Sequence, residues 1–90
     1  MVIDAGEAVQ VVLARLKKLP VAGSLELQTW KRDRSLVVVR ETDGMVLVLE
    51  KGFRQQEYRV ETGRLKNLLK TLLRREFPRS HRVRMVIRQQ

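Results

Sequence analysis

The sequence predicts a single α+β domain over residues 1–90, with its elements in the order α-β-β-β-β-α-β. Apolar residues repeat every three or four positions over residues 5–19 and 65–77, which indicates two amphipathic helices. They alternate with polar residues between positions 24 and 60 and again from 82 to 88, which indicates strands. With 43% hydrophobic residues the chain can fill one modest core. We therefore expect a mainly antiparallel sheet with both helices packed on one face.

The first helix is predicted to follow Asp4, which stands three residues before Glu7 at the spacing of a capping box. Pro20 and Gly23 are typical of its end. Its stripe is small and aliphatic and favours packing in the core. The stripe consists of Ala5, Ala8, Val9, Val12, Leu13, Leu16 and Leu19.

Four strands are predicted next, and the pair Asp43-Gly44 indicates a two-residue hairpin between the second and the third. That turn would place Arg40 opposite Leu47 and would fix which side chains share a face. A second turn is expected at Lys51-Gly52. The expected core face holds Leu25, Leu27, Leu36, Val38, Met45, Leu47, Leu49, Tyr58 and Val60.

The opposite face of the predicted sheet is more apolar than a face that meets only water. It collects Trp30, Val37, Val39, Val46, Val48 and Phe53, with acids among them. This set could be buried in an isologous homodimer, or the two aromatic rings could stack on unpaired bases. The valines and the acids favour the dimer, because valine offers no stacking surface and glutamate repels phosphate.

The second helix is predicted to begin at Thr62 and to end at Pro78. Its buried stripe consists of Leu65, Leu68, Leu69, Leu72, Leu73 and Phe77, and its exposed side carries Lys66, Lys70 and Arg74 at four-residue steps, with Arg75 beside them. In the strand that follows, Val83, Met85 and Ile87 are expected in the core, and Arg82, Arg84 and Arg88 outside. This strand should run parallel to the strand before the helix, either beside it or at the opposite edge of the sheet.

The basic residues are concentrated in the second half of the chain. The formal net charge is +9, and residues 45–90 hold 12 Lys and Arg against four Glu, a net of +8. So large an excess favours a polyanionic partner, most commonly nucleic acid, over a surface that is basic only for solubility. The predicted contact residues are Lys66, Lys70, Arg74, Arg75, Arg79, Arg82 and Arg84, with Arg32 and Arg34 in the loop after the first strand. DNA and RNA, single-stranded or double-stranded, all remain open at this point.

Composition argues against catalysis. There is no Cys, His81 is the only His, and Asp4, Asp33 and Asp43 are assigned to a cap or to turns. We therefore predict no catalytic residues, no metal site, no cofactor and no small-molecule substrate. Early acids argue against a signal peptide, and the longest apolar run, Met45 to Leu49, is too short for a membrane span. A cytoplasmic protein with no membrane partner is expected.

Two functions follow from these surfaces. The first is a non-catalytic nucleic-acid-binding protein whose second helix and last strand contact phosphates with little sequence preference. The alternative is a homodimeric structural or regulatory module that uses the valine face to contact protein.

Overall fold

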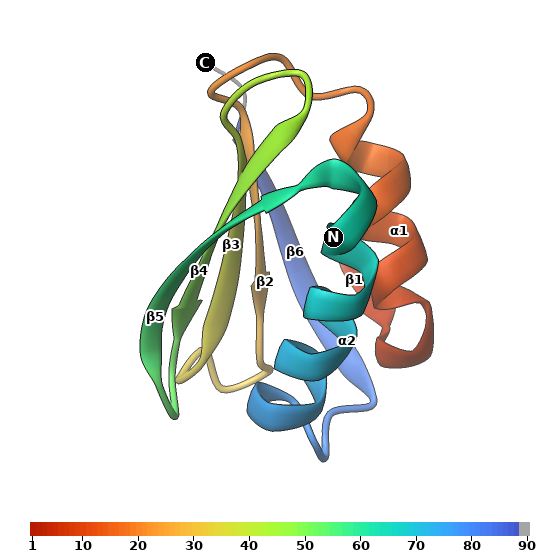
Figure 1. Cartoon of the computed structure of the whole chain (residues 1–90). Coiled ribbons are helices and arrows are strands. Elements are labelled where there is room, and N and C mark those ends of the chain that lie inside the picture. The colour runs from red at the N-terminus through yellow and green to blue at the C-terminus, as the bar shows by residue number, and fades with distance from the viewer. Residues whose placement is uncertain (89–90) are drawn as a thin grey trace.

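The computed structural model describes residues 1–88 and arranges them in two layers, a six-stranded sheet and two helices that cover one of its faces (Figure 1). The predicted α+β class and the order of its seven elements are confirmed. A short strand at the N-terminus precedes them and was not predicted. The elements are β1 (Val2–Asp4), α1 (Ala8–Leu16), β2 (Ser24–Gln28), β3 (Ser35–Arg40), β4 (Met45–Lys51), β5 (Gln55–Glu61), α2 (Leu65–Glu76) and β6 (Arg82–Arg88).

The strands lie in the order β1-β6-β2-β3-β4-β5, and every neighbouring pair is antiparallel. It follows that β6 runs in the same direction as β5, as expected for a chain that crosses over through a helix. The sequence left the position of β6 open. The structure inserts it between β1 and β2, so α2 carries the chain past β4, β3 and β2 before β6 begins (Figure 1).

The core lies between the sheet and the two helices. The predicted helix stripes are confirmed, because their members are buried or packed against the buried cluster. On the sheet, Val83 and Met85 are buried and Ile87 packs against the same cluster. The core cluster consists of Val12, Leu16, Leu19, Leu25, Leu27, Leu36, Val38, Val46, Val48, Leu65, Leu69, Leu72, Phe77, Val83 and Met85.

The predicted register of β4 was wrong by one residue. Arg40 pairs with Val46 rather than with Leu47, and the connection is a three-residue turn in which the Thr42 hydroxyl accepts hydrogen bonds from the amides of Gly44 and Met45. Gly44 does not adopt the positive φ that the predicted two-residue turn requires.

A slip of one residue exchanges the two faces of a strand. Val46 and Val48 are therefore buried in the core instead of lying on the predicted dimer face. Met45, Leu47 and Leu49, which were expected in the core, lie half-buried on the face that no helix covers. Tyr58 and Val60 do pack on the core face as predicted, since β5 pairs with β4 in a register that keeps them there.

The predicted side-chain caps of the two helices do not form. Each helix follows its strand through a short 3-10 turn, Ala5–Glu7 before α1 and Thr62–Arg64 before α2. Neither Asp4 nor Thr62 forms a side-chain cap: Asp4 ends β1, and Thr62 lies inside its 3-10 turn. In both cases a paired strand leads directly into the 3-10 turn. The pairing of that strand, rather than a capping side chain, fixes where the helical segment begins.

Arg40 stabilises the other end of α1 from the core face of β3. Its guanidinium Nη1 donates to the carbonyl oxygens of Leu16 at 3.1 Å and Leu19 at 3.0 Å. Leu16 is the last residue of α1 and Leu19 lies in the segment that follows, so Arg40 places a positive charge at the C-terminus of the helix, where the helix dipole favours it. Neither helix in the described part of the chain is long and apolar enough to cross a membrane.

Candidate functional site

Three connecting segments meet at the lower end of the molecule in Figure 1. They are residues 29–34 between β2 and β3, 51–54 at the turn between β4 and β5, and 77–82 between α2 and β6, and we call them together the loop end. The loop end contains seven Lys and Arg residues and a single acid, Asp33. Two more acids lie beside it: Asp4 at the end of β1, opposite Arg82, and Glu7 in the segment 5–7 that joins β1 to α1 at this end.

The opposite end of the sheet has no such excess. Its connecting segments, residues 17–23, 41–44 and 61–64, hold three basic and three acidic side chains. Two of these acids are engaged within the fold, Glu41 with Arg59 and Asp43 with Arg40. An excess of basic over acidic residues in the connecting segments is therefore found at the loop end and not at the opposite end.

A cleft of about 650 Å³ opens at the loop end, between the loop that follows β2 and the loop that follows α2. Four cationic side chains line it, and its two carboxylates are both occupied by internal hydrogen bonds. The Thr29 hydroxyl donates to Asp33 at 2.6 Å, and this bond lowers the pKa of Asp33. The lining consists of Thr29, Trp30, Lys31, Asp33, Arg34, Glu76, Pro78, Arg79, Ser80, His81 and Arg82.

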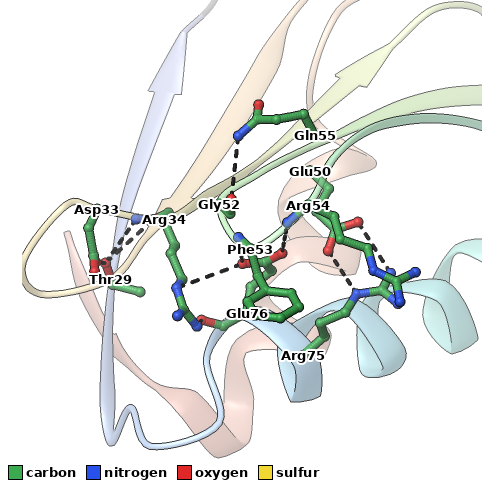
Figure 2. A network of polar contacts seen from close by, with 10 residues as sticks. All are labelled: Thr29, Asp33, Arg34, Glu50, Gly52, Phe53, Arg54, Gln55, Arg75 and Glu76. Carbon is green, nitrogen blue, oxygen red and sulfur yellow. Dashed lines mark hydrogen bonds and ion pairs between the residues drawn. The ribbon is translucent and has the colours of Figure 1, made fainter.

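Glu76, at the end of α2, ties two of these segments together (Figure 2). Its carboxylate is fully buried and accepts hydrogen bonds from the backbone amides of Phe53 at 2.7 Å and Arg54 at 3.1 Å. Arg34 approaches the same carboxylate at 3.9 Å and donates to the Glu76 carbonyl oxygen at 3.3 Å. A Cβ at Gly52 would collide with the Glu76 carboxylate, so the turn can come this close only because residue 52 is glycine.

Arg75, one of the predicted contact residues, is directed inward. Its Nε donates to Glu50 at 2.9 Å, and the Tyr58 hydroxyl donates to the same carboxylate at 2.8 Å (Figure 2 shows the Arg75–Glu50 pair). Burial would raise the pKa of Glu50, but the bonds from Arg75 and Tyr58 hold it below its usual value. Glu50 was expected on the outer face and is instead fully buried on the core face, because of the register of β4.

Lys66, Lys70 and Arg74 form the predicted line along the exposed side of α2. All three are exposed, and none has an acid within ion-pair distance in residues 1–88. Lys70 and Arg74 border a second hollow, of about 340 Å³, between α2 and the start of α1. Pro78 lines both this hollow and the cleft. The basic line of the helix and the basic cleft are therefore adjoining parts of one surface.

The remaining predicted contact residues are in different surroundings. Arg79 and Arg82 are exposed at the cleft, whereas Arg84 lies on the outer face of β6 with its guanidinium 4.1 Å from the centre of the Trp30 ring. Arg32 is exposed in the loop after β2 and has a φ of +61°. That backbone conformation costs a side-chain-bearing residue about 1 kcal/mol, and glycine or asparagine tolerates it better.

Sequence reasoning missed Lys31, Lys51 and Arg54. Lys31 stands next to Arg32 in a segment already identified as basic, so its neighbours were a usable signal. Lys51 and Arg54 flank a turn that only the tertiary fold brings beside the other two loops. Trp30 and Phe53 were assigned to the valine face; both lie in the loop-end segments, beyond the ends of β2 and β4, and the Trp30 ring packs on Arg84 of the outer face.

The face of the sheet that no helix covers has a mixed surface. Arg88 on β6 pairs with Glu26 at 2.9 Å across the neighbouring strand, and Arg59 on β5 pairs with Glu41. Between these ion pairs lie half-buried aliphatic side chains, namely Val37, Val39, Met45, Leu47, Leu49 and Val86.

No group of three or more His, Asp or Glu side chains in residues 1–88 is arranged to hold a metal ion. His81 is exposed in the cleft, where its neighbours along the chain are Ser80 and Arg82. The side chains around His81 in the cleft include hydrogen-bond donors and positively charged groups. They can bind anions.

Models of known protein families, curated proteins and solved structures give no significant match to this chain. The function of the loop end has to be inferred from its own chemistry.

Proposed function

We propose that this chain is a non-catalytic nucleic-acid-binding protein that contacts the phosphate backbone with the loop end and with the adjoining basic line of α2. The observation that carries the proposal is the distribution of charge between the ends of the sheet. With the segment 5–7 included, the connecting segments at this end hold seven basic residues and two acids, whereas those of the opposite end balance at three and three. A basic surface that is confined to one region of the molecule is expected of a protein that binds a polyanion.

The internal ion pairs strengthen this interpretation. Five arginines are paired with acids within the fold, Arg34, Arg40, Arg59, Arg75 and Arg88. The exposed cations around the cleft, Lys31, Arg79 and Arg82, have no such partner in residues 1–88. Arginine suits phosphate because its planar guanidinium donates two hydrogen bonds at once, and lysine adds a mobile point charge.

Phosphate contacts of this kind carry no sequence information, so binding should show little sequence preference. The contacts should come from Lys31, Arg32, Arg54, Arg79 and Arg82 at the loop end and from Lys66, Lys70 and Arg74 on α2. Arg34 holds the site together through Glu76, and it lines the cleft with part of its guanidinium exposed. Arg75 is not among the contacts, because Glu50 binds it.

The test compares two double charge reversals that change the net charge equally. Lys31→Glu with Arg79→Glu alters the loop end, and Lys17→Glu with Lys18→Glu alters the opposite end; all four side chains are exposed. We expect the first variant to bind a labelled oligonucleotide about 10-fold or more weakly than the wild type, because it loses two phosphate contacts. The second should bind nearly as well as the wild type. Equal losses in the two variants would show that only the total charge matters and would refute the site.

A specific observation also favours a homodimer through the uncovered face of the sheet. Its aliphatic residues have no covering layer in residues 1–88, and the two sides of this face differ in charge. On β5, Glu57 and Glu61 flank Arg59, which is paired with Glu41; on β6, Arg84 projects beside Arg88, which is paired with Glu26. A twofold axis parallel to the strands would place β5 of one copy over β6 of the other, so that opposite charges meet around an apolar centre. Such a dimer is compatible with nucleic-acid binding and would double the basic surface.

A further inference from the structure

Two of the four aromatic residues of this chain are exposed, and both lie at the loop end. Phe77 is buried and Tyr58 packs against the core, but Trp30 is 57% exposed and Phe53 is 70% exposed. Large apolar rings in contact with water are costly, and together they suggest a surface that receives a ligand. Their location beside the basic cleft indicates what kind of ligand.

The Trp30 ring is held in place by a contact with one of its two faces. The guanidinium of Arg84 stacks on its ring at 4.1 Å, and Trp30 also lines the cleft. Such a cation–π contact fixes the orientation of the ring. With more than half of the Trp30 surface exposed, the ring remains accessible to a second flat group.

Phe53 lies in the turn between β4 and β5, and Glu76 anchors the backbone of this turn. The Phe53 amide donates to the buried carboxylate of Glu76 at 2.7 Å, which anchors the backbone while the ring stays outside (Figure 2). The guanidinium of Arg34 lies 5.9 Å from the centre of the Phe53 ring and also lines the cleft that contains Trp30. Arg34 therefore lies near one aromatic ring and lines the cleft beside the other.

A duplex offers phosphates at its surface, but its bases are stacked on one another and cannot reach exposed rings. An unpaired strand offers both phosphates and free base faces, and aromatic rings in a positively charged groove are the usual means of binding it. We infer that the loop end binds single-stranded nucleic acid, with bases stacked on Trp30 and Phe53 while Lys31, Arg79 and Arg82 bind the phosphates. This inference rests on the proposed nucleic-acid binding and names the form of its ligand.

Trp30 is the only tryptophan of the chain, so its fluorescence reports directly on one of the two platforms. The experiment titrates the protein at constant salt with a single-stranded oligothymidylate, a duplex of the same length and inorganic polyphosphate. We expect the single strand to quench Trp30 and to bind at least several-fold more tightly than the duplex. Polyphosphate should displace the single strand without quenching, because it has charge but no bases.

Substitutions at Phe53 separate stacking from phosphate binding. Phe53→Ala should weaken single-strand binding about 5- to 100-fold, the range found when an aromatic ring under a base is removed, and should leave polyphosphate binding unchanged. Phe53→Tyr should retain most of the affinity, since it keeps the ring. Val21→Ala is the matched control, because Val21 is a similarly exposed apolar residue at the opposite end of the sheet.

The possible failures are distinguishable. Equal affinity for single strand and duplex, or single-strand binding without quenching, would overturn the stacking inference and leave phosphate binding intact. A Phe53→Ala variant that loses polyphosphate binding to the same degree would assign Phe53 a structural role and also overturn it. If none of the three polyanions binds, the proposed function itself is wrong.

Discussion

Glu50 and Glu76 show how single buried acids organise this basic protein. Both side chains are fully buried, and each satisfies its carboxylate with partners from another element. Glu50 on β4 binds Arg75 of α2, and Glu76 of α2 binds the amides of the turn after β4. Burying a carboxylate is tolerated only when hydrogen bonds or a cation replace its hydration. The two acids therefore fix α2 against the sheet and position the loop end.

These roles could not be predicted from the sequence, because it does not show which residues become the partners of the two acids. Glu50 is 25 residues from Arg75, and Glu76 is 23 residues from Phe53. Alternation placed Glu50 among exposed acids, because an acid at an inward position is the exception unless a partner is known. Arg75 was grouped with the exposed line of α2 for the same reason.

The Glu50 pair predicts a dependence of stability on pH. The pKa of Glu50 is lowered from the ordinary 4.5 in the folded state, so its contribution is present above that value and is lost as the pH falls through the lower folded pKa. Glu50→Gln should reduce the free energy of unfolding at pH 7 by about 2 kcal/mol, since it weakens charge-assisted hydrogen bonds to a buried carboxylate whose partner Arg75 is partly exposed. The variant should also lose stability less steeply than the wild type on acidification below pH 4.5.

Denaturant unfolding at a series of pH values measures both effects. Glu41→Gln is the control, because Glu41 pairs with Arg59 at the same 2.9 Å but in an exposed position, where the side chain of Arg59 is 64% exposed. It should cost less than about 1 kcal/mol. A Glu50→Gln protein as stable as the wild type at pH 7, with the same acid profile, would contradict the role assigned to the buried pair.

At the scale of elements, periodicity was a reliable guide where it extended over many residues. The stripes of both helices, the inward set of β6 and the expected single-face packing of the helices were all predicted correctly. Each of these predictions depends on apolar residues that recur at a fixed spacing over many positions, and a single neighbouring residue does not change such a pattern. The parallel relation of β5 and β6 followed from the handedness of a crossover connection, which is a general property of the fold class.

The errors in the predicted strands occurred where the prediction depended on only a few residues. Asp43-Gly44 indicates a two-residue hairpin, but the Thr42 hydroxyl binds the amides of Gly44 and Met45 and extends the turn to three residues. One added residue moved Val46 and Val48 into the core and Leu47 onto the outer face. Strand β1 has only three residues, and its pairing with β6 supplies what its own sequence lacks. Such a strand is defined by its neighbour and carries too little pattern to be predicted alone.

At the scale of the whole molecule, the uncovered face of the sheet predicts self-association. Wild-type protein should sediment with about twice the mass of the 10.5 kDa chain at high concentration. Leu47→Lys, at the middle of the aliphatic patch, should yield a monomer, because it buries a charge in the apolar centre of the interface. Val21→Lys adds the same charge at an exposed position outside the patch and should not affect the mass. A wild-type protein that remains a monomer at every concentration would rule out the dimer.

The central claim for the whole molecule is that the loop end and α2 bind the phosphate backbone, and the salt dependence of binding tests it most directly. If about five phosphates are contacted, the logarithm of the association constant for a single strand should fall with the logarithm of salt concentration with a slope of about −3.5. Reversing the charge of Lys31 and Arg79 should make that slope shallower by about 1.4, whereas reversing Lys17 and Lys18 should leave it unchanged. An affinity for oligonucleotides that does not fall as salt rises, or a slope that both variants change equally, would contradict the account.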